Sequence, residues 1–235
     1  MRAAAGGNVF TRSLGLLARN PVMVVPGIAI GALAALTGLA LEPVDPLDAN
    51  LFTRALQDCT SLLASIVAIA YTTGMADAAW RTGRAAIADG ARAFRRDGAQ
   101  LFLAMLALFA LGVVAAFAAP FSFGLSFLVY AFFCIYTPAA AVVGERPAFV
   151  AVRESAEIAF ARPVTTLLVV AGIAVVCLFL SVLAEFLAGT SLLGQCAAEI
   201  VIQATVAYLT LVVVGEYGAL RGVSASPGAE SHRRG

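Results

Sequence analysis

The sequence predicts an all-α fold, and specifically a polytopic integral membrane protein with six transmembrane helices. Of its 235 residues, 61% are hydrophobic and 12% are charged, which leaves too few polar side chains to cover a soluble globule of this length. Long uncharged apolar runs recur along the chain. Because unpaired backbone amides are costly in lipid, such runs cross a membrane as helices. The period-2 alternation typical of an outer-membrane barrel is not evident.

Each predicted span has roughly the 20 residues needed to cross about 30 Å of hydrocarbon. The six spans are residues 21–41, 59–76, 99–118, 121–143, 164–184 and approximately 195–215. Pro120 and Gly124 interrupt the uncharged stretch between 99 and 143 and predict a tight hairpin there. Residues 1–222 therefore form one predicted domain, followed at 223–235 by a cytoplasmic tail that we expect to be disordered.

The placement of arginine sets the predicted orientation. All fifteen basic residues are arginine, and fourteen lie before the first span, between spans two and three, between spans four and five, or after the sixth. The opposite side has only Arg54, so the positive-inside rule places both termini in the cytoplasm. A cleaved secretory signal is the rival interpretation of the first run. Arginine without lysine is typical of a GC-rich bacterial genome, so the expected location is the bacterial cytoplasmic (inner) membrane.

Three segments on the cytoplasmic side, residues 8–19, 84–96 and 147–162, each have apolar residues at helical spacing. Each precedes a pair of spans, which predicts three amphipathic helices on the membrane surface and a threefold repeat of helix plus hairpin. The alternative is that these are unrelated arginine-bearing inner loops. The candidate ligands for anionic phospholipid headgroups are Arg12, Arg19, Arg92, Arg95, Arg96, Arg153 and Arg162.

Polar residues inside the predicted spans are the other candidate site. Gln195, Glu199 and Gln203 recur at i, i+4 and i+8 on span six, and Glu185 and Asp58 lie at a similar outer depth. Polar groups at such depth are costly and usually face a partner or a cavity. They indicate either a solute or proton path, or hydrogen bonds between helices near the outer surface.

Small residues in the first span predict a close helix contact. Gly27, Gly31 and Gly38 lie on one face, where a neighbouring helix approaches closely either within the bundle or in a dimer. Two cysteines, Cys59 and Cys196, lie near the predicted outer face. A disulfide between them requires Cα atoms within about 7 Å, which the sequence leaves open.

One segment carries a family resemblance. Thr137-Pro138 ends span four, and residues 142–155 read Val-Val-Gly-Glu-Arg-Pro-Ala-Phe-Val-Ala-Val-Arg-Glu-Ser. This resembles the bacterial YciC-like proteins and the membrane domain attached to some glycerophosphodiester phosphodiesterases, as do Phe10 to Leu14 and Arg19 to Pro21. The resemblance implies the six-span layout. It implies no activity, because these families are largely uncharacterised and Glu154 stands where the pattern often has a basic residue.

No motif in the chain indicates a reaction. Walker, HExxH and GxSxG patterns are absent from the sequence, the cysteines lack metal-ligand spacing, and the one histidine is His232 in the tail. We therefore predict no catalytic residue, metal or cofactor, and a net charge of +1 argues against nucleic acid. The favoured function is a membrane scaffold or lipid-interacting module with phospholipids as partners. A transporter or transporter subunit is the alternative, and a homo-oligomer or membrane-protein partner is compatible with either.

Overall fold

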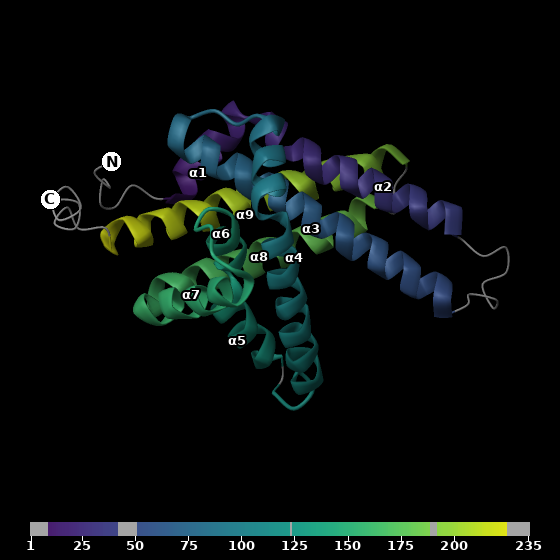
Figure 1. Ribbon diagram of the computed structural model, residues 1–235. Coiled ribbons are helices and arrows are strands. Elements are labelled where there is room, and N and C mark those ends of the chain that lie inside the picture. Colours follow the sequence, from purple (N-terminus) through teal and green to yellow (C-terminus); the bar gives the residue numbers. More distant parts are fainter. Residues whose placement is uncertain (1–8, 42–50, 123, 189–191, 225–235) are drawn as a thin grey trace, which may run out of the picture.

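A computed structural model describes residues 9–41, 51–122, 124–188 and 192–224 (Figure 1). This part of the chain is helical and has no strand, which confirms the all-α fold class. The elements in order are α1 (Val9–Arg19), the 3-10 helix η1 (Pro21–Val24), α2 (Val25–Leu41), α3 (Leu51–Thr82), α4 (Ile87–Ala118), α5 (Leu125–Cys134), α6 (Thr137–Val142), α7 (Ala148–Ala161), α8 (Pro163–Ala188) and α9 (Leu192–Ser224).

Several helices are long and apolar enough to cross a membrane. Ile87–Ala118, Leu125–Val142 and Ile200–Arg221 are three such segments among the described residues. The number rises to five if two bent pairs each count as one span: Val9–Arg19 with Pro21–Leu33, and Ala148–Ala161 with Pro163–Phe179. The predicted second span, 59–76, lies inside α3. The described helices thus agree with a membrane protein but do not establish six spans.

The two bent pairs turn at proline. The axes change direction by 94° between α1 and the helix that follows Asn20, and by 109° between α7 and α8 after Arg162. Proline has no N–H and its ring clashes with the preceding turn, so a helix ends before it. Asn20 has φ −131° and ψ 61°, and Arg162 has φ −136° and ψ 61°. The first and third predicted units therefore turn with the same local backbone geometry.

The second predicted unit does not turn. The sequence predicts a separate surface helix over 84–96, whereas α4 runs unbroken from Ile87 to Ala118. Gly98 stands where the other two units have Pro21 and Pro163. Glycine keeps its N–H and has no ring, so the helix continues through it at a cost of roughly 1 kcal/mol relative to alanine. A threefold repeat of helix plus hairpin is therefore not established.

The core lies where the arginine-bearing segments converge. α3, α6 and α9 are at its centre, with α1, α4 and α7 packed around them (Figure 1). The largest buried side chains of this core are Met23, Met75, Leu101, Tyr136, Leu211 and Tyr217. Away from it, the α4–α5 hairpin extends in a different direction from the α2–α3 pair (Figure 1). Its tip leaves Phe117 and Phe121 77% and 89% exposed, which in water would be an unusually large apolar surface.

A buried asparagine holds the first turn against the core. Asn20 Nδ2 donates to the carbonyl oxygens of Leu16, at 2.8 Å, and Gly83, at 3.2 Å. Its Oδ1 accepts the N–H of Ala85 at 2.8 Å. The side chain is 5% exposed, and it joins the end of α1 to the connection between α3 and α4. These bonds satisfy backbone groups that the proline turn and the loop would otherwise leave unpaired.

Candidate functional site

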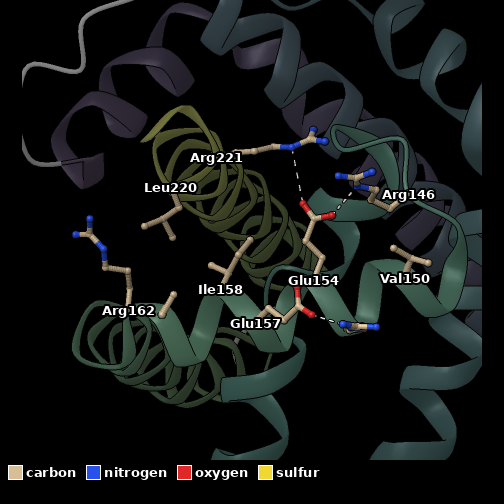
Figure 2. Close-up of a pocket in the computed structure, with 10 residues that line it drawn as sticks. Arg146, Val150, Glu154, Glu157, Ile158, Arg162, Leu220 and Arg221 are labelled. Carbon is tan, nitrogen blue, oxygen red and sulfur yellow. Dashed lines mark hydrogen bonds and ion pairs between the residues drawn. The ribbon is translucent and has the colours of Figure 1, made fainter. Parts of the chain in front are cut away.

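A groove of about 730 Å³ opens between α7 and the last turns of α9 (Figure 2). Its lining combines an apolar floor with charged side chains. The lining residues are Arg146, Val150, Arg153, Glu154, Glu157, Ile158, Ala161, Arg162, Leu220 and Arg221. Four arginines against two glutamates leave the groove with a formal charge of +2. A cationic cavity with apolar walls suits an anionic amphiphile.

Small residues and one serine position α7 against the core. α7 buries Ala148, Ala151, Ser155 and Ala159, spaced three or four apart on one face. Ser155 Oγ donates to the Phe133 carbonyl at 2.7 Å and accepts the N–H of Tyr136 at 3.1 Å. These two backbone groups lie at the break between α5 and α6, next to Pro138. The serine therefore replaces hydrogen bonds that the interrupted helix lacks.

A backbone N–H in the first turn of α7 finds its hydrogen-bond acceptor on another helix. Pro147 precedes it with φ −56° and ψ 150° and supplies no side-chain cap. The N–H of Ala148 instead donates to Gln100 Oε1 of α4 at 3.2 Å. The start of α7 is thus fixed to α4, while its glutamates face the groove.

Glu154 is the centre of the charged cluster in the groove. Its carboxylate accepts Arg146 Nε at 2.6 Å and the Tyr217 hydroxyl at 2.7 Å, and Arg221 Nε lies 3.8 Å away. The Glu154 side chain is 16% exposed. It joins α7, the connection before it and the end of α9 (Figure 2). Hydrogen bonds to a charged group are stronger than those between neutral groups, and this carboxylate is largely shielded from solvent. The cluster therefore fixes the shape of the groove.

A glycine lets Tyr217 reach Glu154. A Cβ added to Gly144 would lie 2.3 Å from the Tyr217 hydroxyl oxygen and 2.4 Å from the Ala140 carbonyl oxygen. The next residue, Glu145, has φ 52°, in the left-handed region that glycine usually occupies. Position 144 therefore needs glycine for the close approach, and the residue in the left-handed conformation, in the connection between α6 and α7, is Glu145.

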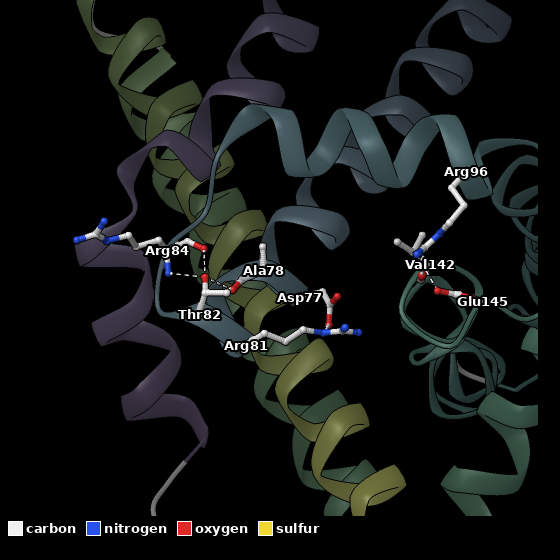
Figure 3. A network of polar contacts seen from close by, with 8 residues as sticks. All are labelled: Asp77, Ala78, Arg81, Thr82, Arg84, Arg96, Val142 and Glu145. Atoms are coloured by element: carbon white, nitrogen blue, oxygen red, sulfur yellow. Dashed lines mark hydrogen bonds and ion pairs between the residues drawn. The ribbon is translucent and has the colours of Figure 1, made fainter. Parts of the chain in front are cut away.

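Arg96 holds Glu145, the residue with the left-handed backbone conformation, through an ion pair. Its guanidinium contacts Glu145 Oε1 at 2.7 Å and the carbonyl of Val142 at 3.0 Å (Figure 3). It also contacts Asp97 Oδ2 at 2.8 Å. Arg96 was predicted as a headgroup ligand, but each of its three guanidinium nitrogens contacts a protein group. Its contacts support a structural role at the junction of α4 and α6.

The other predicted headgroup arginines have different surroundings. The guanidinium of Arg12 stacks on Trp80, 4.6 Å from the ring centroid. Arg92 pairs with Asp89, and Arg153 Nε pairs with Glu157 at 2.7 Å on an exposed turn. Arg19, Arg95 and Arg162 are exposed and make no ion pair with any residue that the structure describes. These last three are the arginines most available to a ligand.

A second cleft, of about 520 Å³, lies between α3 and the start of α4. Its arginines face acidic partners: Arg81 Nε contacts Asp77 Oδ1 at 2.8 Å, and Arg92 contacts Asp89. Figure 3 shows the Asp77–Arg81 pair beside Thr82 and Arg84. With its cations paired, this cleft has less to offer an anion than the groove does.

The predicted polar stripe on the sixth span is described only at Gln203. A Cβ on Gly27 would lie 2.0 Å from Gln203 Oε1, so this glycine makes room for the side chain between α2 and α9. Gly27 therefore packs helices within the chain, and Gly31 and Gly38 lie farther along α2. The side chains of Gln195, Glu199, Glu185 and Asp58, and the proposed pairing of Cys59 with Cys196, lie outside the described residues.

Of the residues that line the groove, the sequence predicted only Arg153 and Arg162 as site residues. Arg146 and Glu154 entered the sequence analysis only through the family resemblance, without a shared role, and Tyr217 and Arg221 were not candidates. Their spacing at i and i+4 in the last turns of α9 was the available signal. No protein-family model, curated protein or solved structure matches the chain.

Proposed function

We propose that the chain is a non-enzymatic protein of the bacterial inner membrane, a scaffold or lipid-interacting module that binds anionic phospholipids at its cytoplasmic face. The observation that carries the proposal is the direction of α1 and α7. Each arginine-bearing helix turns by 94° or 109° into the apolar helix that follows. If the apolar helices cross the membrane, α1 and α7 lie along its surface.

The exposed faces of these helices support a surface position. α7 leaves Phe149 and Phe160 77% and 69% exposed and buries only alanine and serine. α1 leaves Leu14 61% exposed and buries Ser13 and Leu16. Large apolar side chains at the level of the headgroups favour burial in the acyl boundary. The arginines beside them then reach lipid phosphates, each adding about 1 kcal/mol of attraction.

The lipids that remain bound after purification test this proposal. We expect anionic lipids to be enriched over zwitterionic ones when the wild-type protein is released from bilayers of mixed composition and analysed by native mass spectrometry. Replacing Arg19, Arg95 and Arg162 together by glutamine should reduce this enrichment roughly tenfold or more. Arg54→Gln, on the opposite predicted side, is the matched control. Equal retention of both lipid classes by the wild type would refute the proposal.

The transport alternative has no specific support among the described residues. Gln203, the described member of the polar stripe, lies against Gly27, which is a helix-packing contact. Membership of the YciC-like or phosphodiesterase-associated membrane families stays a prediction from the residues quoted above, and the proposed function takes nothing from it.

A further inference from the structure

The four arginines of the groove differ in how far protein carboxylates neutralise them. Arg146 contacts Glu154 at 2.6 Å, and Arg153 contacts Glu157 at 2.7 Å. Arg221 reaches Glu154 only at 3.8 Å, the outer limit of an ion pair. Arg162 forms no ion pair within the described part of the chain, but its charge interacts with the carboxylate of Glu216 on α9. Arg162 and Arg221 are therefore the two groove arginines without a close carboxylate contact, and their donors are the most available to a ligand.

These two arginines lie at the ends of different helices and border one apolar surface. Arg162 follows the last residue of α7, and Arg221 lies in the last turns of α9. Figure 2 shows Ile158 and Leu220 between them, with Arg162 on one side and Arg221 above Glu154 on the other. An occupant thus meets two separated guanidinium groups and an apolar floor at the same time.

We infer that the groove is a binding site for a lipid headgroup with two negative charges, carried by one phosphomonoester or by two phosphodiesters. The inference rests on the proposed function and names its lipid class. Two charges on the ligand would match the formal charge of +2 carried by the residues that line the groove, next to which Glu216 is a further acidic group. Guanidinium groups bind phosphate oxygens in a bidentate manner, and a phosphomonoester carries about −1.5 to −2 at neutral pH. The apolar floor receives the glycerol and the first acyl carbons.

Glu154 limits the affinity of this site. It holds Arg146 and lies within 3.8 Å of Arg221, so it competes with a phosphate for both groups. Glutamine at this position would keep an oxygen for the Tyr217 hydroxyl and remove the negative charge. The variant Glu154→Gln should therefore bind a dianionic headgroup more tightly than the wild type.

Lipid competition in nanodiscs tests the inference with the full chain. The bilayers contain a zwitterionic lipid, phosphatidylglycerol with one charge, and either phosphatidic acid or cardiolipin, and native mass spectrometry gives the ratio of dianionic to monoanionic lipid bound. We expect the wild type to favour at least one dianionic lipid by roughly fivefold or more. Arg162→Gln and Arg221→Gln should each remove most of that preference, and Glu154→Gln should increase it.

The control variant is Arg84→Gln, an exposed arginine on the same predicted side of the membrane that does not line the groove. It should leave the dianionic preference unchanged. Anionic enrichment without a dianionic preference, or a preference that survives Arg162→Gln and Arg221→Gln, would overturn the inference while the proposed function stands. No anionic enrichment at all would overturn both.

Inorganic phosphate added to the same nanodiscs separates a lipid from a soluble phosphate. We expect phosphate at millimolar concentration to leave the bound lipid in place, because it gains nothing from Ile158 and Leu220. Displacement of the dianionic lipid by phosphate at that concentration would assign the groove to a soluble anion and overturn the lipid assignment. Preference for phosphatidic acid alone supports the phosphomonoester form, and preference for cardiolipin alone supports the form with two phosphodiesters.

Discussion

The hydroxyl of Tyr217 donates a 2.7 Å hydrogen bond to Glu154, across 63 residues of sequence. This contact ties the end of α9 to α7 and forms one side of the charged groove. Tyr217 is fully buried, and Gly144 provides the space that its hydroxyl group needs. The shape of the groove therefore depends on a bond between two helices that are distant in the chain.

Removing this hydroxyl should destabilise the protein while the aromatic ring still fills its place in the core. We expect Tyr217→Phe to lower the free energy of unfolding in detergent micelles by about 1.5–3 kcal/mol, since the lost bond is to a charged acceptor. The control is Tyr208→Phe, because the Tyr208 hydroxyl reaches the Phe10 carbonyl only at 3.4 Å and such a long bond is weak. Equal losses in the two variants would mean that the Tyr217–Glu154 bond contributes little.

Ser155 offers a test of how α7 is held at the break between α5 and α6. Ser155→Ala leaves the Phe133 carbonyl and the Tyr136 N–H without this partner, and we expect a loss of about 1–3 kcal/mol in a chemical unfolding titration. The matched variant is Ser13→Ala. Ser13 is equally buried, but its hydroxyl has no hydrogen-bond partner among the described residues, so its removal should be neutral or slightly stabilising. A neutral Ser155→Ala would contradict the role assigned to this serine.

Two substitutions of Asn20 with different chemistry test the hydrogen bonds that this side chain makes at the first turn. Asn20→Ala removes the three hydrogen bonds at the first turn. Asn20→Asp keeps the acceptor for the Ala85 N–H but points a second oxygen at the carbonyls of Leu16 and Gly83. We expect aspartate to lower the thermal unfolding temperature at least as much as alanine, because an unpaired charge near two carbonyl oxygens is costly. A wild-type melting temperature for Asn20→Asp would show that Nδ2 does not hold the turn.

Gly98 tests why the second unit lacks a turn. Gly98→Pro removes the N–H inside α4, and we expect it to cost about 3 kcal/mol or more and to reduce helical content by circular dichroism. Gly112→Ala is the comparison, since an added Cβ there meets Tyr130 at an ordinary 3.6 Å and helix propensity improves. If Gly98→Pro were as stable as the wild type, a turn at this position would be compatible with the fold.

These contacts show which features followed from sequence patterns and which did not. The fold class was predictable because the lipid solvent restricts apolar spans to helices. The turns at Pro21 and Pro163 were predictable from the chemistry of proline. The separate helix predicted over 84–96 was wrong, because Gly98 does not interrupt the backbone hydrogen bonds of α4. The groove was only partly predictable. Arg162 was visible as a surface charge, whereas the approach of Tyr217 to Glu154 depends on tertiary packing at Gly144.

Distances between arginine and lipid phosphate test the central claim most directly. Every basic residue of the sequence except His232 is an arginine. Labelling arginine with ¹³C and ¹⁵N therefore reports on the basic side chains as a group. Solid-state NMR in bilayers of anionic lipid then measures dipolar dephasing of the guanidinium carbons by lipid ³¹P. We expect clear dephasing in the wild type and a large loss of it when Arg19, Arg95 and Arg162 are glutamine. Absence of dephasing in the wild type, or dephasing unchanged in the triple variant, would contradict the claim that these arginines bind phospholipid headgroups.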